Sequence, residues 1–330
     1  SYERKLFNLW LRTFFEDIVM TSENPNQFDL IIIGSGPAGL AAAIYAARAS
    51  ISTLIIDQSS AGGQVKTTHQ VANYPGFVEP VSGYELARSM RKQAERFGAK
   101  FELATEIIKI NLEPQEKKIQ TNDVIYTSKN ILIATGSSPR LLNLPGEQEF
   151  QGSGISYCAT CDGEFYKDKD IIVVGGGNSA MEESLLLLQY VKSITVIHQF
   201  DVLQAEKVTA DKMLNNQKVK FLWSHEPRSF MKSDNKMVIR AENLKTKEMV
   251  QMEKDGIFIF VGMTPNTALF KNSSLQLSEH GYIITNEKME TNLEGVYAAG
   301  DVRVKKYRQI TTAVGDGTIA ALEIIQKRQF

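Results

Sequence analysis

The stretch DLIIIGSGPAGLAAAIYAARASISTLIID at residues 29–57 has the pattern of a strand, a glycine turn, a helix and a second strand. Gly34, Gly36 and Gly39 follow a β-branched apolar run, and Asp57 ends the next one. Two glycines at this spacing let the chain turn and approach a pyrophosphate, while the third lets helix and strand pack closely. The stretch therefore predicts a βαβ unit that binds a dinucleotide, with Asp57 on a ribose diol.

A second copy of the pattern, DIIVVGGGNSAMEESLLLLQYVKSITVIH, occupies residues 170–198 and aligns with the first without a gap. Gly175, Gly177 and Ala180 form an accepted variant of the glycine fingerprint. The residue aligned with the diol-binding aspartate is His198. The repeat predicts an α/β protein with two Rossmann-like domains.

Both cysteines of the chain, Cys158 and Cys161, stand in the short stretch SYCATCDGEF. The four histidines lie singly and far apart, which argues against a zinc site, and we expect no metal. A bridge that closes so small a loop removes little chain entropy, which argues against a structural staple. The spacing favours a redox-active dithiol that opens and closes without disturbing the fold.

The bulk properties are those of a globular protein with one large domain or two ordinary ones: 330 residues, 43% hydrophobic and 23% charged. A net charge of −1 offers no broad field for nucleic acid. No apolar run approaches the roughly 18 residues that a membrane span needs, and no secretory signal is recognised. We therefore expect a cytoplasmic protein with no nucleic-acid or membrane partner, and in a reducing cytosol a close cysteine pair is more often catalytic.

Residues 1–27 are expected to form an N-terminal extension. Its apolar side chains recur at helical spacing through Phe7, Trp10, Leu11, Phe14 and Ile18. Because acidic residues offset the basic ones, we favour a helix that docks on its own protein or a neighbouring subunit over a membrane-surface anchor.

Taken together, residues 28–325 resemble the low-molecular-weight thioredoxin reductases, FAD enzymes that reduce the disulfide of thioredoxin. The resemblance rests on motifs that occur in the family's order: GSGPAG (34–39), AGGQV (61–65), ANYPG (72–76), ATGSSP (134–139), CATCDG (158–163), GGGNSAMEE (175–183), AAGDV (298–302) and YRQI (307–310). It implies a homodimer and an FAD domain that is discontinuous in sequence, formed by residues 28–137 and 263–330. A central NAD(P)-like domain, residues 138–262, carries the C-x-x-C pair, and it is expected to rotate at crossings near 134–139 and 260–265.

The resemblance also implies where FAD binds. The adenosine ribose would meet Asp57, Asn73 and Thr135 would line the flavin side, and Asp301 would meet the ribityl chain. The alternatives are a turn residue for Asn73 and a helix N-cap for Asp301. The expected cofactor residues are Gly34, Ser35, Gly36, Pro37, Ala38, Gly39, Asp57, Gln58, Gly62, Gly63, Gln64, Asn73, Thr135, Gly136, Gly300, Asp301, Arg308, Gln309 and Ile310.

On the family pattern, Cys161 is the thiol beside the flavin and Cys158 attacks the partner's disulfide. A cysteine at a helix start is acidified by free N–H groups, which favours the nucleophilic thiolate. Asp162 is expected to act as general acid and base, with a pKa raised by partial burial, although a capping carboxylate is the alternative.

The sequence departs from the family in HQFDVLQAEK, residues 198–207. Gln199, Phe200 and Gln204 replace the three arginines that clamp the 2′-phosphate of NADPH in the family. Charge-assisted hydrogen bonds are worth about 1.5–3 kcal/mol each, so NADPH is doubtful as a donor.

Four functions remain open. The first is thioredoxin reduction with another donor, ferredoxin being possible because some branches of the family use it. The second is an NAD(P)H-dependent reductase with an unusual nicotinamide site. A dithiol oxidase is less favoured, because such enzymes tend to have His where this chain has Asp162, and the retained CATCD argues against a non-enzymatic redox sensor. The terminal Phe330 is either a frayed helix end or an aromatic cover for the flavin.

Overall fold

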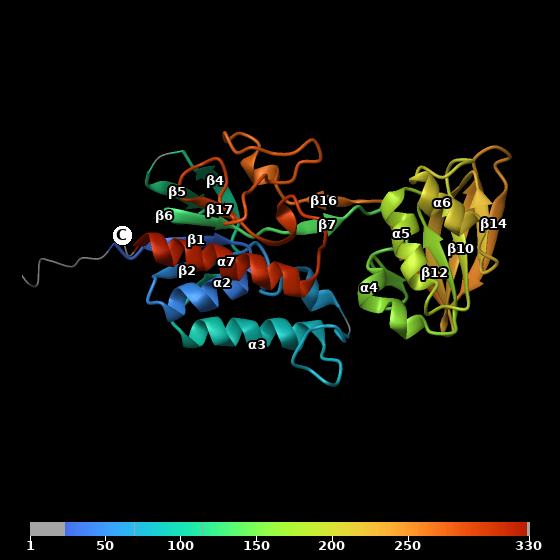
Figure 1. Ribbon diagram of the computed structural model, residues 1–330, viewed down its shortest axis with the longest axis horizontal. Helices are drawn as coiled ribbons and strands as arrows, with labels where there is room; N and C mark the ends of the chain where they lie inside the picture. The colour runs from blue at the N-terminus through green and yellow to red at the C-terminus, as the bar shows by residue number, and fades with distance from the viewer. Residues whose placement is uncertain (1–23, 69, 114, 329–330) are drawn as a thin grey trace, which may run out of the picture.

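The computed structural model describes residues 24–328 except 69 and 114 (Figure 1). The helix expected before residue 20 and the position of Phe330 lie outside the described residues. Within them two α/β units are joined by a narrow two-stranded ribbon (Figure 1).

The first unit is built on a sheet that joins segments from both ends of the chain. In the described residues it has seven strands in the order β3-β2-β1-β6-β5-β4, with β17 also paired to β6. β1, β2, β3, β6 and β17 run parallel to one another, while β5 pairs antiparallel with β6 and β4 pairs antiparallel with β5. The strands are β1 (Gln27–Ile33), β2 (Thr53–Ile56), β3 (Lys100–Glu102), β4 (Ile107–Asn111), β5 (Lys117–Thr121), β6 (Ile125–Ile133) and β17 (Val296–Ala298).

Three helices cover one face of this sheet (Figure 1): α2 (Pro37–Arg48), α3 (Gly83–Arg96) and α7 (Ile310–Arg328). α2 is alanine-rich and packs closely on α7. The helices are so close at Gly317 that a Cβ there would lie 2.0 Å from the Ala38 carbonyl oxygen. Short helices η1 (Gly63–Thr67), η3 (Ala268–Phe270) and η4 (Gly300–Val302) lie in the connections.

The second unit has a parallel sheet in the order β11-β10-β9-β15-β8. Its helices and a three-stranded antiparallel sheet, β12-β13-β14, pack on opposite faces through two separate apolar clusters. The elements are β8 (Ile155–Ser156), α4 (Ala159–Asp162), η2 (Gly163–Tyr166), β9 (Asp170–Val174), α5 (Asn178–Leu187), β10 (Ser193–His198), α6 (Lys207–Leu214), β11 (Val219–Trp223), β12 (His225–Ser233), β13 (Lys236–Asn243), β14 (Met249–Lys254) and β15 (Gly256–Ile259).

The ribbon between the units is formed by β7 (Ser137–Pro139) and β16 (Met263–Pro265), which pair antiparallel. On the side of the second unit, the Arg140 N–H donates to the Gly262 carbonyl at 2.9 Å. Both strands fall within the two expected crossings, residues 134–139 and 260–265.

The predicted fold class, an α/β protein with two Rossmann-like units, is confirmed by the two sheets, each of which has parallel strands with helices packed on it. β17 pairs with β6, so the segment after the second crossing completes the sheet begun before the first. Among the described residues, none of the helices is both long enough and apolar enough to cross a membrane, and His, Cys, Asp and Glu form no cluster of three that could hold a metal ion.

Candidate active site

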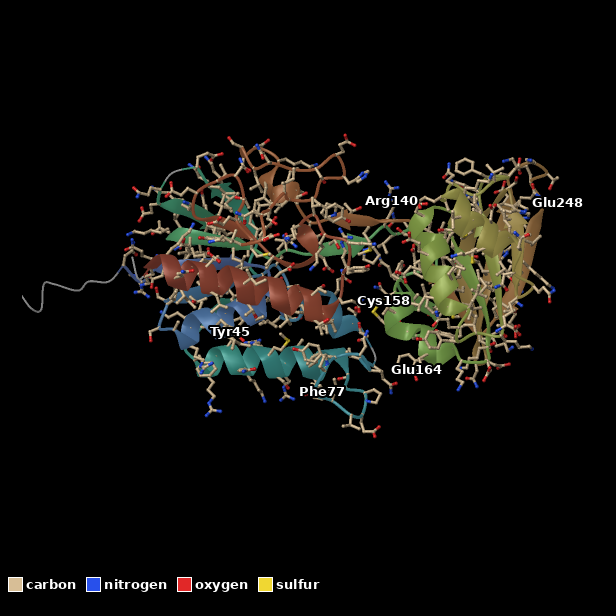
Figure 2. The ribbon with its side chains drawn as sticks, in the orientation of Figure 1. Tyr45, Phe77, Arg140, Cys158, Glu164 and Glu248 are labelled. Carbon is tan, nitrogen blue, oxygen red and sulfur yellow. A yellow bond between two sulfur atoms is a disulfide. The ribbon has the colours of Figure 1, made fainter. Side chains whose placement is uncertain are left out.

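A cavity of about 1810 Å³ lies between the two units, and residues of both units line it. Cys158, Cys161 and Asp162 line it from the second unit. Every expected cofactor residue also lines it, except Ser35, Gly39 and Gly62. Figure 2 shows Cys158 on the side of the second unit that faces the first, with Glu248 at the far end of the molecule. The structure thus gathers the predicted residues around one space.

The first glycine turn leaves room that side chains would fill. Gly34 has φ +103°, and a Cβ there would lie 2.4 Å from the Ala134 carbonyl oxygen. A Cβ on Gly39 would lie 2.0 Å from the Gly34 carbonyl oxygen, so α2 begins close to the end of β1. Gly36 caps α2 without a side chain, so the helix's first N–H groups have no side-chain acceptor there and can meet a phosphate.

Ser35 and Gly62, which do not line the cavity, support its wall. Asp57 Oδ2 accepts hydrogen bonds from Ser35 N at 2.7 Å and Ser35 Oγ at 2.6 Å, and its Oδ1 accepts from Ser59 N at 2.9 Å. The Gly62 N–H donates to the Ser35 carbonyl at 2.9 Å. The carboxylate is therefore fixed at the cavity wall, and a ribose diol would displace a serine hydroxyl to reach it.

Among the described residues, four that line the cavity have a buried polar side-chain atom without a hydrogen-bond partner: Ser137, Glu183, Asp301 and Arg308. In Asp301 and Arg308 these atoms are Oδ1 and Nε. Burial raises the pKa of Asp301, while the cations of Lys305 and Arg308 oppose this. η4 starts after Ala299 with no side-chain capping bond, so the structure does not show Asp301 as an N-cap. Unpaired buried polar groups cost free energy unless a ligand satisfies them, so the site fits a bound polar group such as the ribityl chain and ring edge of FAD.

Asn73 and Gln309 meet across the same wall. Asn73 Nδ2 donates to Gln309 Oε1 at 3.3 Å, and Gln309 Nε2 donates to the Arg308 carbonyl at 2.8 Å. The Arg308 guanidinium lies over the Tyr282 ring at 4.4 Å from its centroid. These contacts hold the polar side chains of this wall in fixed directions.

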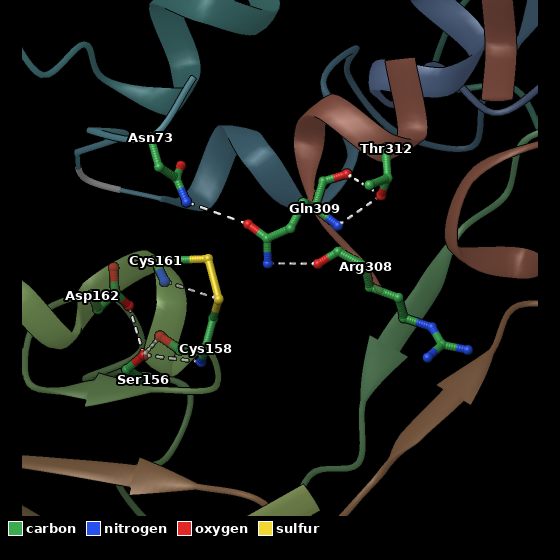
Figure 3. Close-up of a disulfide and its surroundings, with 8 residues drawn as sticks. All are labelled: Asn73, Ser156, Cys158, Cys161, Asp162, Arg308, Gln309 and Thr312. Carbon is green, nitrogen blue, oxygen red and sulfur yellow. Dashed lines mark hydrogen bonds between the residues drawn. A yellow bond between two sulfur atoms is a disulfide. The ribbon is translucent and has the colours of Figure 1, made fainter. Parts of the chain in front are cut away.

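The cysteine pair forms a disulfide with a Cα–Cα distance of 5.3 Å, and it faces Asn73 and Gln309 of the first unit (Figure 3). Cys158 is the N-cap of α4, and its Sγ accepts a hydrogen bond from Cys161 N at 3.2 Å. The same N–H would stabilise a Cys158 thiolate after the disulfide opens, which matches the expected acidification at a helix start.

Asp162 is held by Ser156, a residue that the sequence did not indicate. Ser156 Oγ donates to Asp162 Oδ2 at 2.6 Å and accepts from Cys158 N at 3.1 Å (Figure 3). Burial raises the pKa of Asp162, and the Ser156 hydrogen bond partly opposes the rise. A carboxyl with a raised pKa beside the dithiol holds its proton to a higher pH than an ordinary aspartate and can therefore act as a proton donor there.

A second carboxyl that the sequence did not single out, Glu183 of α5, also lines the cavity. Its Oε2 is buried without a hydrogen-bond partner in the described residues. Burial raises the pKa of Glu183, and the Ala159 backbone N–H lowers it. The only advance signal was the position of Glu183 at the end of the GGGNSAMEE motif.

The second glycine turn is occupied by the side chain at the strand end. A Cβ on Gly176 would lie 2.5 Å from Nδ1 of His198, a residue that is only 5% exposed. His198 Nε2 lies 3.1 Å from the Val202 carbonyl oxygen, and burial lowers the pKa of His198. Asp201, the nearest carboxylate along the chain, is bonded to Ser224 and Lys245. At the position aligned with Asp57 of the first copy, the second copy therefore has a buried imidazole whose lowered pKa favours the neutral form.

The comparisons with known proteins agree with this site. The chain belongs to the pyridine nucleotide-disulphide oxidoreductase family, whose model matches residues 28–317.

Its relatives include thioredoxin reductases and a protein named for its operon. It is 47% identical over 296 residues to the "34.2 kDa protein in rubredoxin operon" of Clostridium pasteurianum, covering 90% of this chain and 96% of that protein. It is 44% identical to the thioredoxin reductase of Peptoclostridium acidaminophilum, again over 90% and 96% of the two chains. The crystal structure of thioredoxin reductase from Streptococcus pyogenes superposes with a TM-score of 0.87 at 42% identity, covering 92% of this chain and 99% of that one.

Proposed function

We propose that the chain is an FAD-dependent disulfide reductase that passes electrons through Cys158 and Cys161 to the disulfide of thioredoxin or a similar protein. One observation carries the proposal: the disulfide shares a cavity with the glycine turn and with Asp301 and Arg308, each of which has a buried polar atom left unpaired within the described residues. A disulfide beside a dinucleotide cradle is suited to two-electron exchange with a flavin. The relationship to thioredoxin reductases supports the same reaction.

We assign FAD to the wall made by the first unit. The turn at residues 34–39 would hold the pyrophosphate, Asp57 the ribose, and Asp301 the ribityl chain, while Asn73 and residues 308–310 would border the ring. When bound, FAD supplies the two-electron chemistry that this chain's side chains lack.

The side chains of the second unit perform the remaining chemistry. Opening the disulfide takes two electrons and leaves two sulfurs, of which the one on Cys161 accepts a proton from Asp162. Cys158 stays a thiolate at the start of α4 and attacks the partner's disulfide. Cys161 then gives its proton back to Asp162 and attacks the mixed disulfide, which releases the reduced partner.

A protein disulfide needs the sulfurs at the surface, whereas here they face the cavity. We therefore infer that the second unit, residues 138–262, rotates on the β7–β16 ribbon relative to residues 28–137 and 263–330. The homodimer that the family implies is part of the same proposal.

We propose that the electron donor is not NADPH. No arginine stands at 199, 200 or 204, where the NADPH-using members of the family carry the three that clamp the 2′-phosphate. A one-electron protein carrier such as ferredoxin fits these features, because it needs no nucleotide site. The name of one relative places it in a rubredoxin operon, which is compatible with a protein as donor.

An anaerobic mixing experiment tests the donor. The purified flavoprotein is mixed in turn with NADPH, NADH and reduced ferredoxin, and flavin bleaching is followed by absorbance. Reduced ferredoxin should bleach the flavin and support thioredoxin reduction. Rapid bleaching by micromolar NADPH would overturn the donor proposal and favour the nicotinamide-dependent alternative.

A Cys158→Ser variant tests the dithiol route itself. It should keep its bound flavin and lose thioredoxin reduction, because a serine hydroxyl cannot take the place of the thiolate in attacking a disulfide. Retained reduction would refute the mechanism, and bleaching of the wild-type flavin by small dithiols with oxygen uptake would show a dithiol oxidase instead.

A further inference from the structure

Glu147 is a buried carboxylate that the chemistry above does not use. It is 1% exposed and lies in a turn after the ribbon strand β7. The Phe230 N–H donates to the Pro145 carbonyl at 2.8 Å, and a Cβ on Gly146 would lie 2.1 Å from the Phe230 carbonyl oxygen. The backbone of the turn is therefore pressed against β12 and cannot shift without disturbing that strand.

The carboxylate of Glu147 joins two parts of the second unit. Its Oε1 accepts hydrogen bonds from Leu142 N at 3.0 Å and from Tyr157 Oη at 2.8 Å, and its Oε2 accepts from Leu144 N at 3.3 Å. Leu142 and Leu144 belong to the segment that enters from the ribbon, whereas Tyr157 immediately precedes Cys158. One side chain thus connects the entry from the ribbon to the dithiol.

The dithiol needs such a connection because its own strand is short. β8 comprises only Ile155 and Ser156, so its pairing with β15 ends before Cys158. Beyond that point the tyrosine hydroxyl is a fixed contact to another segment of the unit. A carboxylate suits this place, since both oxygens accept; an amide would turn one of them into a donor facing another donor.

We propose that Glu147 and Tyr157 form a positioning pair that fixes the Cys158 end of the dithiol relative to the ribbon. When the second unit rotates back, the pair returns the sulfurs to one place in the cavity. The inference rests on the proposed transfer of electrons from FAD to the disulfide. In that step the disulfide would accept two electrons from the bound cofactor, the S–S bond breaks, Cys161 takes up a proton from Asp162, and Cys158 remains a thiolate.

The decisive variant is Tyr157→Phe, which removes one hydroxyl and keeps the ring. The flavin is photoreduced anaerobically without any protein donor, and new thiols are counted against time. We expect transfer to the disulfide to slow about three- to tenfold, the range for one lost hydrogen bond. Exchange of the chemically pre-reduced dithiol with thioredoxin disulfide should change less than about twofold, since that step does not need the docked position.

The matched control is Tyr126→Phe in β6, a buried tyrosine beside Glu102 in the first unit, far from the ribbon. It should leave both rates unchanged. Glu147→Gln should slow the same step, and the double variant should be no slower than Glu147→Gln alone, because the two residues act through one bond. If Glu147→Gln does not fold, Tyr157→Phe alone decides.

Equal transfer rates in Tyr157→Phe and wild type would overturn the positioning role. So would equal slowing in Tyr126→Phe, or slowing of thioredoxin exchange to the same extent as electron transfer. Failure of the photoreduced wild-type protein to form any thiols would instead overturn the proposed function, so the two failures are distinguishable.

Discussion

The two βαβ units of this chain share a backbone plan and differ in what ends their second strand. In both, the first strand runs parallel to the second, and the first turn glycine has a positive φ, +103° at Gly34 and +130° at Gly175. In the first βαβ copy, the second strand is followed by Asp57, which lines the large cavity. In the second copy, the second strand ends at His198, whose ring packs on the glycine turn of that copy. The backbone plan is therefore common to both copies, and they differ in the polar group at the strand end, a carboxylate in the first and an imidazole in the second.

The third fingerprint position differs as well. In the first unit it is Gly39, where a Cβ would lie 2.0 Å from a backbone oxygen. In the second unit it is Ala180, a real side chain that is buried without displacing the turn. The first helix consequently starts closer to its strand than the second does, and this close approach suits the unit assigned to FAD.

The largest effect is expected from Gly39→Ala, which places at the third fingerprint position of the first copy the residue type that the second copy has there. Overpacking usually costs about 1–3 kcal/mol, and here the clash is with backbone that no rotamer change can relieve. We expect a marked loss of melting temperature and of bound flavin, measured by thermal melting and by absorbance. The matched control is Ala180→Gly, which should cost about 1 kcal/mol and keep its flavin. A Gly39→Ala protein with normal flavin content would show that the close approach is not needed.

The next effect concerns the donor. Gln199→Arg, Phe200→Arg and Gln204→Arg together restore the cations that the family uses, at three exposed positions. Each charge-assisted bond to the 2′-phosphate is worth about 1.5–3 kcal/mol, so NADPH should bleach the flavin at concentrations at least about 100-fold lower than in the wild type. NADH, which lacks that phosphate, serves as the control and should improve far less. Equal gains for both nucleotides would mean that general charge is responsible.

Most of the fold could be predicted from sequence, because strand, glycine turn and helix are local patterns and the unit is written twice. The cysteine pair and Asp162 were also local signals. Contacts between distant segments were not predictable: Asn73 and Gln309 are 236 residues apart and meet only when both halves of the first sheet assemble. The hydrogen bonds of Ser156 to Asp162 and of Glu147 to Tyr157 join residues that are close in sequence. They were not predictable either, because they depend on how irregular turns are folded. The antiparallel layer β12–β14 was missed as well.

A smaller effect is expected from Asp57→Asn in the first unit. The amide nitrogen would face the N–H and hydroxyl donors of Ser35 or Ser59, and the charge that favours a ribose diol would be lost. We expect FAD affinity to fall about 10- to 100-fold, measured by titrating apoprotein with FAD and following flavin fluorescence. His198→Asn, the equivalent change in the second unit, should leave FAD affinity unchanged. A loss of FAD in both variants would point to general destabilisation.

The smallest effect is a pH dependence of the free energy of unfolding that is due to His198 at the end of β10. Burial lowers the pKa of His198 in the folded protein below its usual value of 6.5, so below pH 6.5 the unfolded chain binds the proton more readily. The neutral ring thus contributes fully above pH 6.5, and its contribution is lost as the pH falls towards the folded-state pKa. Chemical denaturation at pH 7.5 and 5.5 should show a loss of stability at the lower pH that is absent in His198→Gln. An identical pH dependence in the variant would mean that His198 can be protonated without leaving its turn, and would reopen this site to a nucleotide phosphate.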